Sequence, residues 1–132
     1  MLPWTRCCVR YGVAAVDRQR LGREAEARAA QVLQQAGLTV LMRNYRCRAG
    51  EIDIVACDFE LLVIAEVRLR SRAEFGGAAA SITAAKRARI VRATRYLQRC
   101  RPALSHLPVR FDVLLLHAAG GPIEWIRSAF FT

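Results

Sequence analysis

Residues 50–68 read GEIDIVACDFELLVIAEVR, and this stretch decides the fold. Residues 51–57 alternate between apolar and more polar side chains, which is the pattern of a strand with two unlike faces. Residues 60–67 are almost continuously apolar, as in a strand that is buried on both faces. A tight turn at Asp58-Phe59 would connect the two runs, so the stretch predicts a β-hairpin.

Two acidic residues lie within these strands. Strand alternation places Asp53 on the face opposite to that of Ile52 and Ile54. Glu66 follows five apolar residues, and a charge inside a buried strand is unfavourable unless it is paired or binds a metal. With the turn at its predicted place, Asp53 stands opposite Ile64 and diagonal to Glu66, so the two carboxylates can converge.

Two carboxylates with a nearby cation suit the hydrolysis of phosphodiester bonds. Carboxylate oxygens hold hard cations such as Mg²⁺ or Mn²⁺, and the metal polarises the phosphate and activates a water. Glu26 is a third candidate, because it lies beside the apolar stripe of a predicted helix. The alternatives are an ion pair of Glu66 with Arg68 or Arg70, and a solvent-facing Glu26.

The remaining elements follow from hydrophobic periodicity and from turn residues. The chain predicts the order helix, strand, strand, strand, helix, strand, strand, which is an α/β fold with a central mixed sheet flanked by helices. The expected ranges are a helix at 21–36, a strand at 38–42, a basic connection at 43–50, a loop at 70–81, a helix at 83–100 capped by Thr83, and strands at 109–116 and 123–126.

The charge of the chain favours a polyanionic partner. Its 132 residues carry 21 basic and 11 acidic side chains, for a net charge of +10. Such a field favours nucleic acid or an acidic membrane face, and a basic surface that serves solubility is the alternative. No apolar run approaches the length of a membrane span. The five cysteines lack a zinc-ligand spacing, and we interpret them as reduced thiols of a cytoplasmic protein.

A series of motifs occurs in a fixed order along the chain. It comprises Gly22-x-x-x-Glu26-x-x-Ala29-x-x-x-Leu33-x-x-x-Gly37, Arg43-Asn44-Tyr45-Arg46, Gly50-Glu51-Ile52-Asp53, Glu66-Val67-Arg68, Phe75-Gly76, Lys86 and Arg110-Phe111-Asp112. The series resembles that of the YraN-type family of bacterial predicted endonucleases, which are distantly similar to Holliday junction resolvases. The resemblance covers residues 21–131 and implies a restriction-endonuclease-like fold.

The resemblance also implies a site. Asp53 and Glu66 would be the metal-binding acids of an Asp…Glu-x-Lys motif, and Glu26 would be an additional helix carboxylate. Arg68 stands at the lysine position; it keeps the charge but cannot give up a proton, so it puts turnover in question. Lys86, on the second helix, could supply a displaced lysine, with a contact to a nucleic-acid backbone or a solvated position as the alternatives.

These observations lead to three hypotheses. The first is a metal-dependent endonuclease that cleaves DNA, branched DNA included, with catalytic Asp53, Glu66, Arg68 and Glu26, and with phosphate contacts from Arg43, Arg46, Arg48, Lys86 and Arg89. The second is a non-catalytic nucleic-acid-binding or scaffold protein that retains the fold. The third is a basic protein-interaction module. Residues 1–20 are predicted to be a loosely ordered leader to a domain at 21–132, and a homodimer is expected only by analogy with resolvases.

Overall fold

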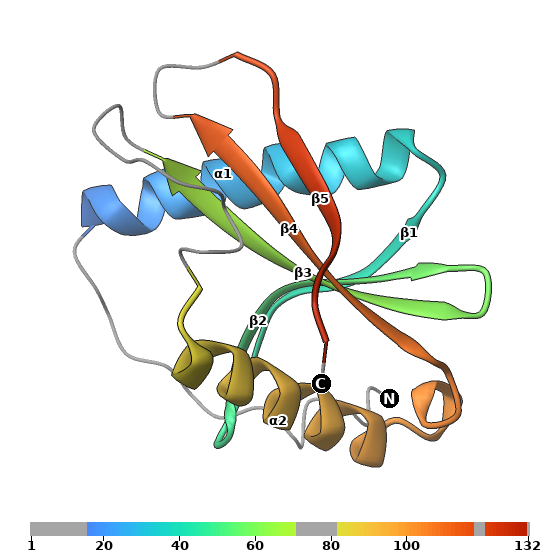
Figure 1. Ribbon diagram of the computed structural model, residues 1–132. Helices are drawn as coiled ribbons and strands as arrows, with labels where there is room; N and C mark the ends of the chain where they lie inside the picture. Colours follow the sequence, from blue (N-terminus) through green and yellow to red (C-terminus); the bar gives the residue numbers. More distant parts are fainter. Residues whose placement is uncertain (1–15, 71–81, 118–120, 132) are drawn as a thin grey trace.

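A computed structural model describes residues 16–70, 82–117 and 121–131 (Figure 1). Two helices and five strands follow one another in the predicted order. They are α1 (Val16–Gln35), β1 (Thr39–Cys47), β2 (Gly50–Asp58), β3 (Leu61–Arg70), α2 (Ala84–Cys100), β4 (Val109–His117) and β5 (Glu124–Phe130), with a short 3₁₀ helix, η3 (Pro102–Leu104), before β4.

The strands form one mixed sheet in the order β1-β2-β3-β4-β5. The neighbouring pairs are antiparallel except β3 and β4, which run parallel. A parallel pair requires a crossover connection, and α2 lies within the connection between β3 and β4. The predicted α/β class, with a central mixed sheet flanked by helices, is confirmed.

The two helices cover opposite faces of the sheet (Figure 1). On β3, Leu62 and Ile64 pack into the core beneath α2, whereas Val63 and Ala65 pack into the core beneath α1. The strand is therefore buried on both faces, as its apolar run predicts. The expected buried stripe of α2 is also present, at Ile90, Ala93, Thr94 and Leu97.

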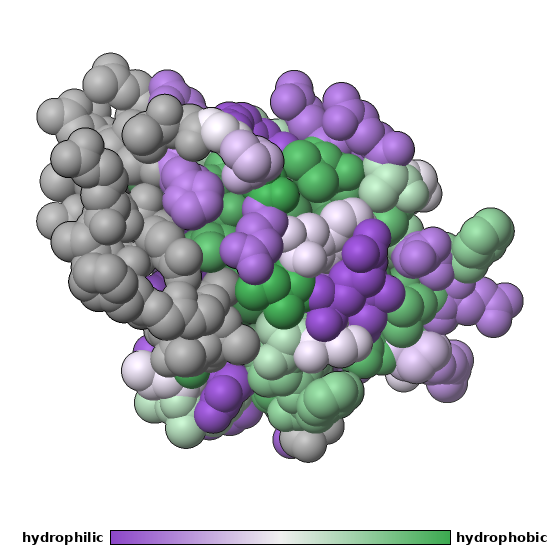
Figure 2. All heavy atoms as spheres, turned by 45° about the horizontal axis from the view of Figure 1, so that its top comes forward, coloured by the Kyte–Doolittle hydropathy of each residue, from purple (hydrophilic) through white to green (hydrophobic). Residues whose placement is uncertain are grey.

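The hairpin of β2 and β3 turns one residue later than predicted. Asp58 pairs with Leu61, so the turn consists of Phe59 and Glu60. Phe59 adopts a left-handed conformation with φ 57°, and its side chain is 97% exposed. The end of this hairpin projects at the right of Figures 1 and 2. The shift changes the register of the whole hairpin, because Ile54 now stands opposite Ala65.

Three boundaries differ from the predicted ones, and one of them is the end of β5, which lies at Phe130 rather than at residue 126. Strand β1 continues to Cys47, so most of the predicted basic connection is strand. Its residues pair with those of β2 as far as Cys47 and Gly50. Helix α1 begins at Val16 rather than at residue 21, and residues 1–15 of the predicted leader lie outside the described residues. Most of the predicted loop at 70–81 lies outside them as well.

The thiols only partly match their interpretation. Cys47 and Cys57 are free, but Cys100 is disulfide-bonded, so the prediction of reduced thiols is wrong at Cys100. Within the described residues, no helix combines the length and the apolar character that a membrane span requires.

Candidate metal centre

The site lies where strands β2 and β3 stop pairing. Their ladder ends at Ile54 and Ala65. At the same point the alternation of β2 slips by one residue, because Ile52 packs beneath α2 while Ile54 packs beneath α1. The predicted common face for these two isoleucines is therefore wrong. Asp53 is the residue at the slip, which places its side chain at the opening between the strands.

The side chain of Asp53 spans this opening. Its Oδ2 accepts a hydrogen bond of 2.8 Å from the backbone N–H of Val67, the residue after Glu66. A side chain thus replaces the backbone acceptor that the diverging strand no longer offers. The bond fixes the Asp53 carboxylate beside Glu66 on the neighbouring strand. The predicted neighbourhood of the two acids is present, but the pairing is shifted by two residues, because Ile54 stands opposite Ala65 rather than Val63.

Glu66 points towards α2. It is only 5% exposed and shares its strand face with Leu62 and Ile64. Its Oε2 lies 2.8 Å from Nζ of Lys86, so the buried carboxylate is ion-paired. From the sequence, Arg68 and Arg70 are candidate partners of Glu66, and the ion pair found here is with Lys86, on a helix further along the chain. Arg68 lies two residues beyond Glu66 on the same strand face, opposite Leu115 of β4.

The start of α2 fixes the position of Lys86. Thr83 caps the helix in an extended conformation, and its Oγ1 accepts a 3.1 Å hydrogen bond from the backbone N–H of Lys86. This confirms the predicted cap. Lys86 is therefore the third residue of the helix and projects from its first turn over β3. Its side chain is 35% exposed, so the ammonium contacts both a buried acid and the solvent.

Glu26 approaches the same point from α1. Its side chain is half-buried, and its Oε1 is buried without a hydrogen-bond partner. The pKa of Glu26 is raised, mainly by burial and to a smaller extent by the charge of Glu51. It is lowered in part by hydrogen bonding with Asn44 and Asp53 and by the charge of Arg43. These neighbours are on β1 and β2, so Glu26 faces the sheet, as the metal hypothesis requires.

The electrostatics show how closely the acids are placed. The pKa of Asp53 is raised well above its usual value, first by burial and then by the charges of Glu66 and Glu26. The hydrogen bond from Val67 and the charge of Lys86 lower it in part. Three carboxylates from one helix and two strands thus share a region that carries one lysine ammonium.

A divalent cation fits the chemistry of these donors. Carboxylate oxygens are the ligands that Mg²⁺ and Mn²⁺ prefer, and Glu26 offers a buried oxygen without a partner. A cation would also neutralise the charge that raises the pKa of Asp53. Within the described ranges, however, no three His, Cys, Asp or Glu side chains are already gathered as a metal-binding group. Metal binding would therefore have to draw the three carboxylates together.

The predicted phosphate-contacting residues fall into two groups. Arg43, Arg48 and Arg89 are exposed. Arg46 is half-buried and forms a 3.3 Å ion pair with Glu51, and Lys86 is engaged with Glu66.

Close packing holds two members of the first group, Arg48 and Arg89, near each other. A Cβ on Gly50 would lie 3.1 Å from the backbone oxygen of Arg89, so the β1–β2 turn rests directly on α2. This contact brings Arg48, in the turn, next to the helix that carries Arg89 and Lys86. Of the three exposed arginines, Arg89 shares α2 with Lys86, Arg48 lies in the turn that leads into the strand of Asp53, and Arg43 lies on the neighbouring β1.

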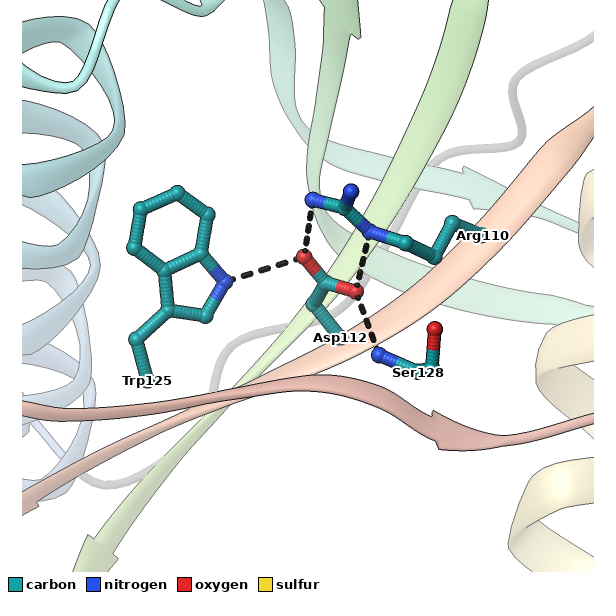
Figure 3. Close-up of polar contacts among 4 residues, drawn as sticks. All are labelled: Arg110, Asp112, Trp125 and Ser128. Atoms are coloured by element: carbon teal, nitrogen blue, oxygen red, sulfur yellow. Dashed lines mark hydrogen bonds and ion pairs between the residues drawn. The ribbon is translucent and has the colours of Figure 1, made fainter.

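Asp112 belongs to a different cluster of polar contacts, on β4 and β5 (Figure 3). It is fully buried on β4 and accepts two hydrogen bonds from Arg110, at 2.9 and 2.8 Å. Nε1 of Trp125 and the backbone N–H of Ser128 donate to the same carboxylate at 2.9 and 3.0 Å. Ser128 has φ 54° next to the irregular pairing of β4 with β5, so Asp112 stabilises that irregularity. Arg110 and Asp112 of the Arg110-Phe111-Asp112 motif are thus paired with each other.

Fold and site together define a class: an α/β protein with carboxylates and a lysine gathered where its central strands diverge. Its family follows from sequence comparison. Residues 25–116 match the family described as "Uncharacterised protein family UPF0102". A UPF0102 protein of Nitrosomonas europaea is 50% identical over 111 residues, which cover 83% of this chain and 92% of that protein.

Two further relatives extend the match. A UPF0102 protein of Methylobacillus flagellatus is 50% identical over 114 residues, covering 85% of this chain and 97% of the relative. A UPF0102 protein of Pseudomonas putida is 42% identical over 119 residues, which cover 88% of this chain and 97% of that relative. The chain therefore belongs to the UPF0102 family, and the resemblance to the YraN-type proteins is confirmed.

Proposed function

We propose that this protein is a metal-dependent nuclease that hydrolyses phosphodiester bonds in DNA. The observation that supports it best is the placement of Asp53 beside Glu66, through the 2.8 Å bond to the N–H of Val67, at the opening between two strands. Several carboxylates gathered in a buried or half-buried region repel one another, and a single lysine ammonium there favours a site that also takes a cation. The unpartnered Oε1 of Glu26 adds a third donor.

In the proposed reaction, Asp53, Glu66 and Glu26 hold Mg²⁺ or Mn²⁺. The bound metal would supply Lewis-acid polarisation of the phosphate and lower the pKa of a water molecule. Water adds to phosphorus, and the bond from phosphorus to one ester oxygen breaks. The proton of the water passes to solvent and the leaving oxygen takes up a proton, which leaves a phosphate monoester and a hydroxyl. Asp53 and Glu66 also orient the reacting groups, since both carboxylates are fixed by the protein.

Positive charge on the surface supports a nucleic-acid substrate. The chain has a net charge of +10, and the exposed Arg43, Arg48 and Arg89 lie on the elements around the site. Arginines at such positions contact phosphates and orient a backbone without reading its sequence. DNA is therefore the proposed partner. A homodimer, which the two-fold symmetry of a branched substrate would suit, stays a prediction.

A non-catalytic binding protein is the second candidate function. The observation that favours it is Arg68, because the Asp…Glu-x-Lys pattern requires a lysine there. The guanidinium is bulkier than an ammonium and presents a planar fork of donors rather than a compact charge. A protein that kept the fold and lost the lysine would bind DNA without cutting it.

The deciding experiment compares the native protein with Asp53→Ala on linear duplex, single-stranded and four-way-junction DNA with Mn²⁺. We expect the native protein to cut at least one substrate and the variant to be at least about 100-fold slower, because it lacks a metal ligand. If neither protein cuts any substrate and both bind DNA equally well, the catalytic proposal is wrong and the binding function replaces it.

A further inference from the structure

The ion pair between Lys86 of α2 and Glu66 of β3 suggests which residue replaces the lysine that the Asp…Glu-x-Lys motif lacks at position 68. We propose that Lys86, reaching over from α2, supplies the catalytic ammonium that the Asp…Glu-x-Lys pattern places on β3. This inference rests on the proposed nuclease function. Lys86 would touch the scissile phosphate or the attacking water, whereas Arg68 would contribute charge without occupying the catalytic position.

Geometry is the first support. Nζ of Lys86 lies 2.8 Å from Oε2 of Glu66, so an ammonium is already next to one proposed metal ligand. Its charge also acts on the second ligand, because it lowers the pKa of Asp53. The side chain is 35% exposed, in contrast to 7% for that of Glu66, so the ammonium can reach a substrate from the solvent side.

Composition is the second support. Among 21 basic residues, Lys86 is the single lysine of the chain. Because almost all basic residues of the chain are arginine, an arginine at position 68 follows the general composition. The lysine at position 86 departs from that composition. A compact ammonium with three donors differs from a planar guanidinium mainly where space is small and the charge must approach one atom closely. The contact with the buried Glu66 is such a place.

The ammonium would act by charge and hydrogen bonding, with no proton transfer. It would donate hydrogen bonds to a non-bridging phosphate oxygen, on which negative charge grows as water attacks, and it would stay protonated. Removing one such donor typically lowers a rate by about 100- to 1000-fold. The carboxylate of Glu66 would have two roles: it would position the ammonium of Lys86 and it would bind the metal.

The activity test moves the lysine between the two positions. We expect Lys86→Met to lose cleavage by about 100-fold or more and Arg68→Met to lose less than about tenfold. The double variant Lys86→Met with Arg68→Lys, which returns a lysine to β3, should recover to within about tenfold of the native rate. Arg95→Met, which removes an exposed charge from the same helix, should cleave as the native protein does. The inference is overturned if Lys86→Met cleaves normally, or if Arg68→Met is the variant that abolishes cleavage.

A binding measurement decides the inference without activity. Removing an ammonium that lies next to a metal ligand should tighten Mn²⁺ binding by roughly three- to tenfold, because a competing cation is lost. Calorimetric titration of Lys86→Met and Arg95→Met measures this change. Unchanged Mn²⁺ affinity in Lys86→Met means that the lysine is not at the metal centre, and the inference fails.

Two controls separate the ways of failing. Lys86→Met leaves Glu66 buried without its partner, so folding must be checked by circular dichroism. Lys86→Arg keeps the ion pair if Lys86→Met does not fold, and we expect it to lose cleavage by at least about tenfold because the fork misplaces the charge; native rates in Lys86→Arg overturn the inference. If the native protein cuts no DNA, the proposed function fails, and the Mn²⁺ titration still decides the place of Lys86.

Discussion

The backbone N–H of Val67 donates a 2.8 Å hydrogen bond to Oδ2 of Asp53, across the point where β2 and β3 separate. This bond joins the two acids of the site through the backbone of the strand that carries Glu66. The pairing of β2 with β3 ends at Ile54 and Ala65, just before Asp53 and Glu66 would pair. The side chain of Asp53 therefore accepts the hydrogen bond that a backbone carbonyl would accept in a continuous ladder. The end of the β2–β3 pairing is thus bridged by the side chain of a proposed site residue.

The first prediction concerns stability and pH in the absence of metal. Burial and two carboxylate neighbours raise the pKa of Asp53 in the folded protein, so the folded state binds this proton more tightly than the unfolded chain does. The contribution of Asp53 to stability should therefore be greatest below the pKa of the unfolded aspartate and should be lost as pH rises from that value through the native pKa. Urea denaturation at a series of pH values measures this slope.

Asp53→Asn provides the comparison. The amide oxygen can still accept from Val67, but it carries no charge, so the variant should be more stable than the native protein at neutral pH and less dependent on pH. Asp53→Ala, which also loses the hydrogen-bond acceptor for Val67, should gain less stability at neutral pH than Asp53→Asn does. A native protein whose stability rises over this pH range would contradict the electrostatic description of the site.

The second prediction concerns the contact between the β1–β2 turn and α2. In Gly50→Ala, the new Cβ would lie 3.1 Å from the backbone oxygen of Arg89 and 3.3 Å from its Cβ, so the turn must move away from the helix. We expect a loss of roughly 1 to 3 kcal/mol in the free energy of unfolding. Gly22→Ala is the matched control: nothing lies within 4 Å, and its position within α1 should yield a gain of roughly 0.5 to 1 kcal/mol.

The third prediction separates structural from functional acids. Asp112→Ala leaves the guanidinium of Arg110 and the indole N–H of Trp125 without their acceptor, and removing one partner of a buried ion pair costs about 3 to 5 kcal/mol. Thermal unfolding should show this loss. At a temperature where the variant is still folded, its Mn²⁺ affinity should equal that of the native protein. A large loss of Mn²⁺ binding in the folded variant would place Asp112 in the metal centre instead.

The fourth prediction concerns the exposed arginines. Arg48→Ser and Arg89→Ser should each weaken binding to a DNA duplex and reduce the slope of log affinity against log salt by roughly one. Fluorescence anisotropy at several salt concentrations measures both quantities. Arg99→Ser removes an exposed charge from the last turn of α2, remote from the site, and should leave the slope unchanged. Equal effects of all three variants would indicate diffuse attraction rather than a defined binding surface.

Much of the fold could be predicted because its signals are local. The apolar run before Glu66, the buried stripe of α2 and the cap at Thr83 each depend on residues close in sequence. The register of the hairpin could not be predicted, because Phe59 takes a left-handed conformation that turn preferences assign to glycine or asparagine. The slip of β2 at Asp53 was also missed, since apolar residues on both of its faces hide a change of alternation.

The site shows the same limit. Asp53 and Glu66 are on adjacent strands, so the hairpin pattern alone brings them near each other. The ion pair of Lys86 with Glu66 depends on how α2, which connects the parallel strands β3 and β4, packs on the face of the sheet. No local sequence pattern encodes this packing. The sequence signals for Lys86 were that it is the one lysine of the chain and that it stands in the motif series. The hydrogen-bonding role of Asn44 towards Glu26 likewise depends on tertiary contact between β1 and α1.

The central claim is that Asp53 and Glu66 hold one divalent cation. Calorimetric titration with Mn²⁺ of the native protein, Asp53→Asn, Glu66→Gln and the control Glu24→Gln, an exposed acid of α1, tests it most directly. We predict one Mn²⁺ per chain for the native protein and for Glu24→Gln, with affinity lower by at least about tenfold in the other two variants. No binding to the native protein at millimolar Mn²⁺, or equal binding by Asp53→Asn, would contradict the claim.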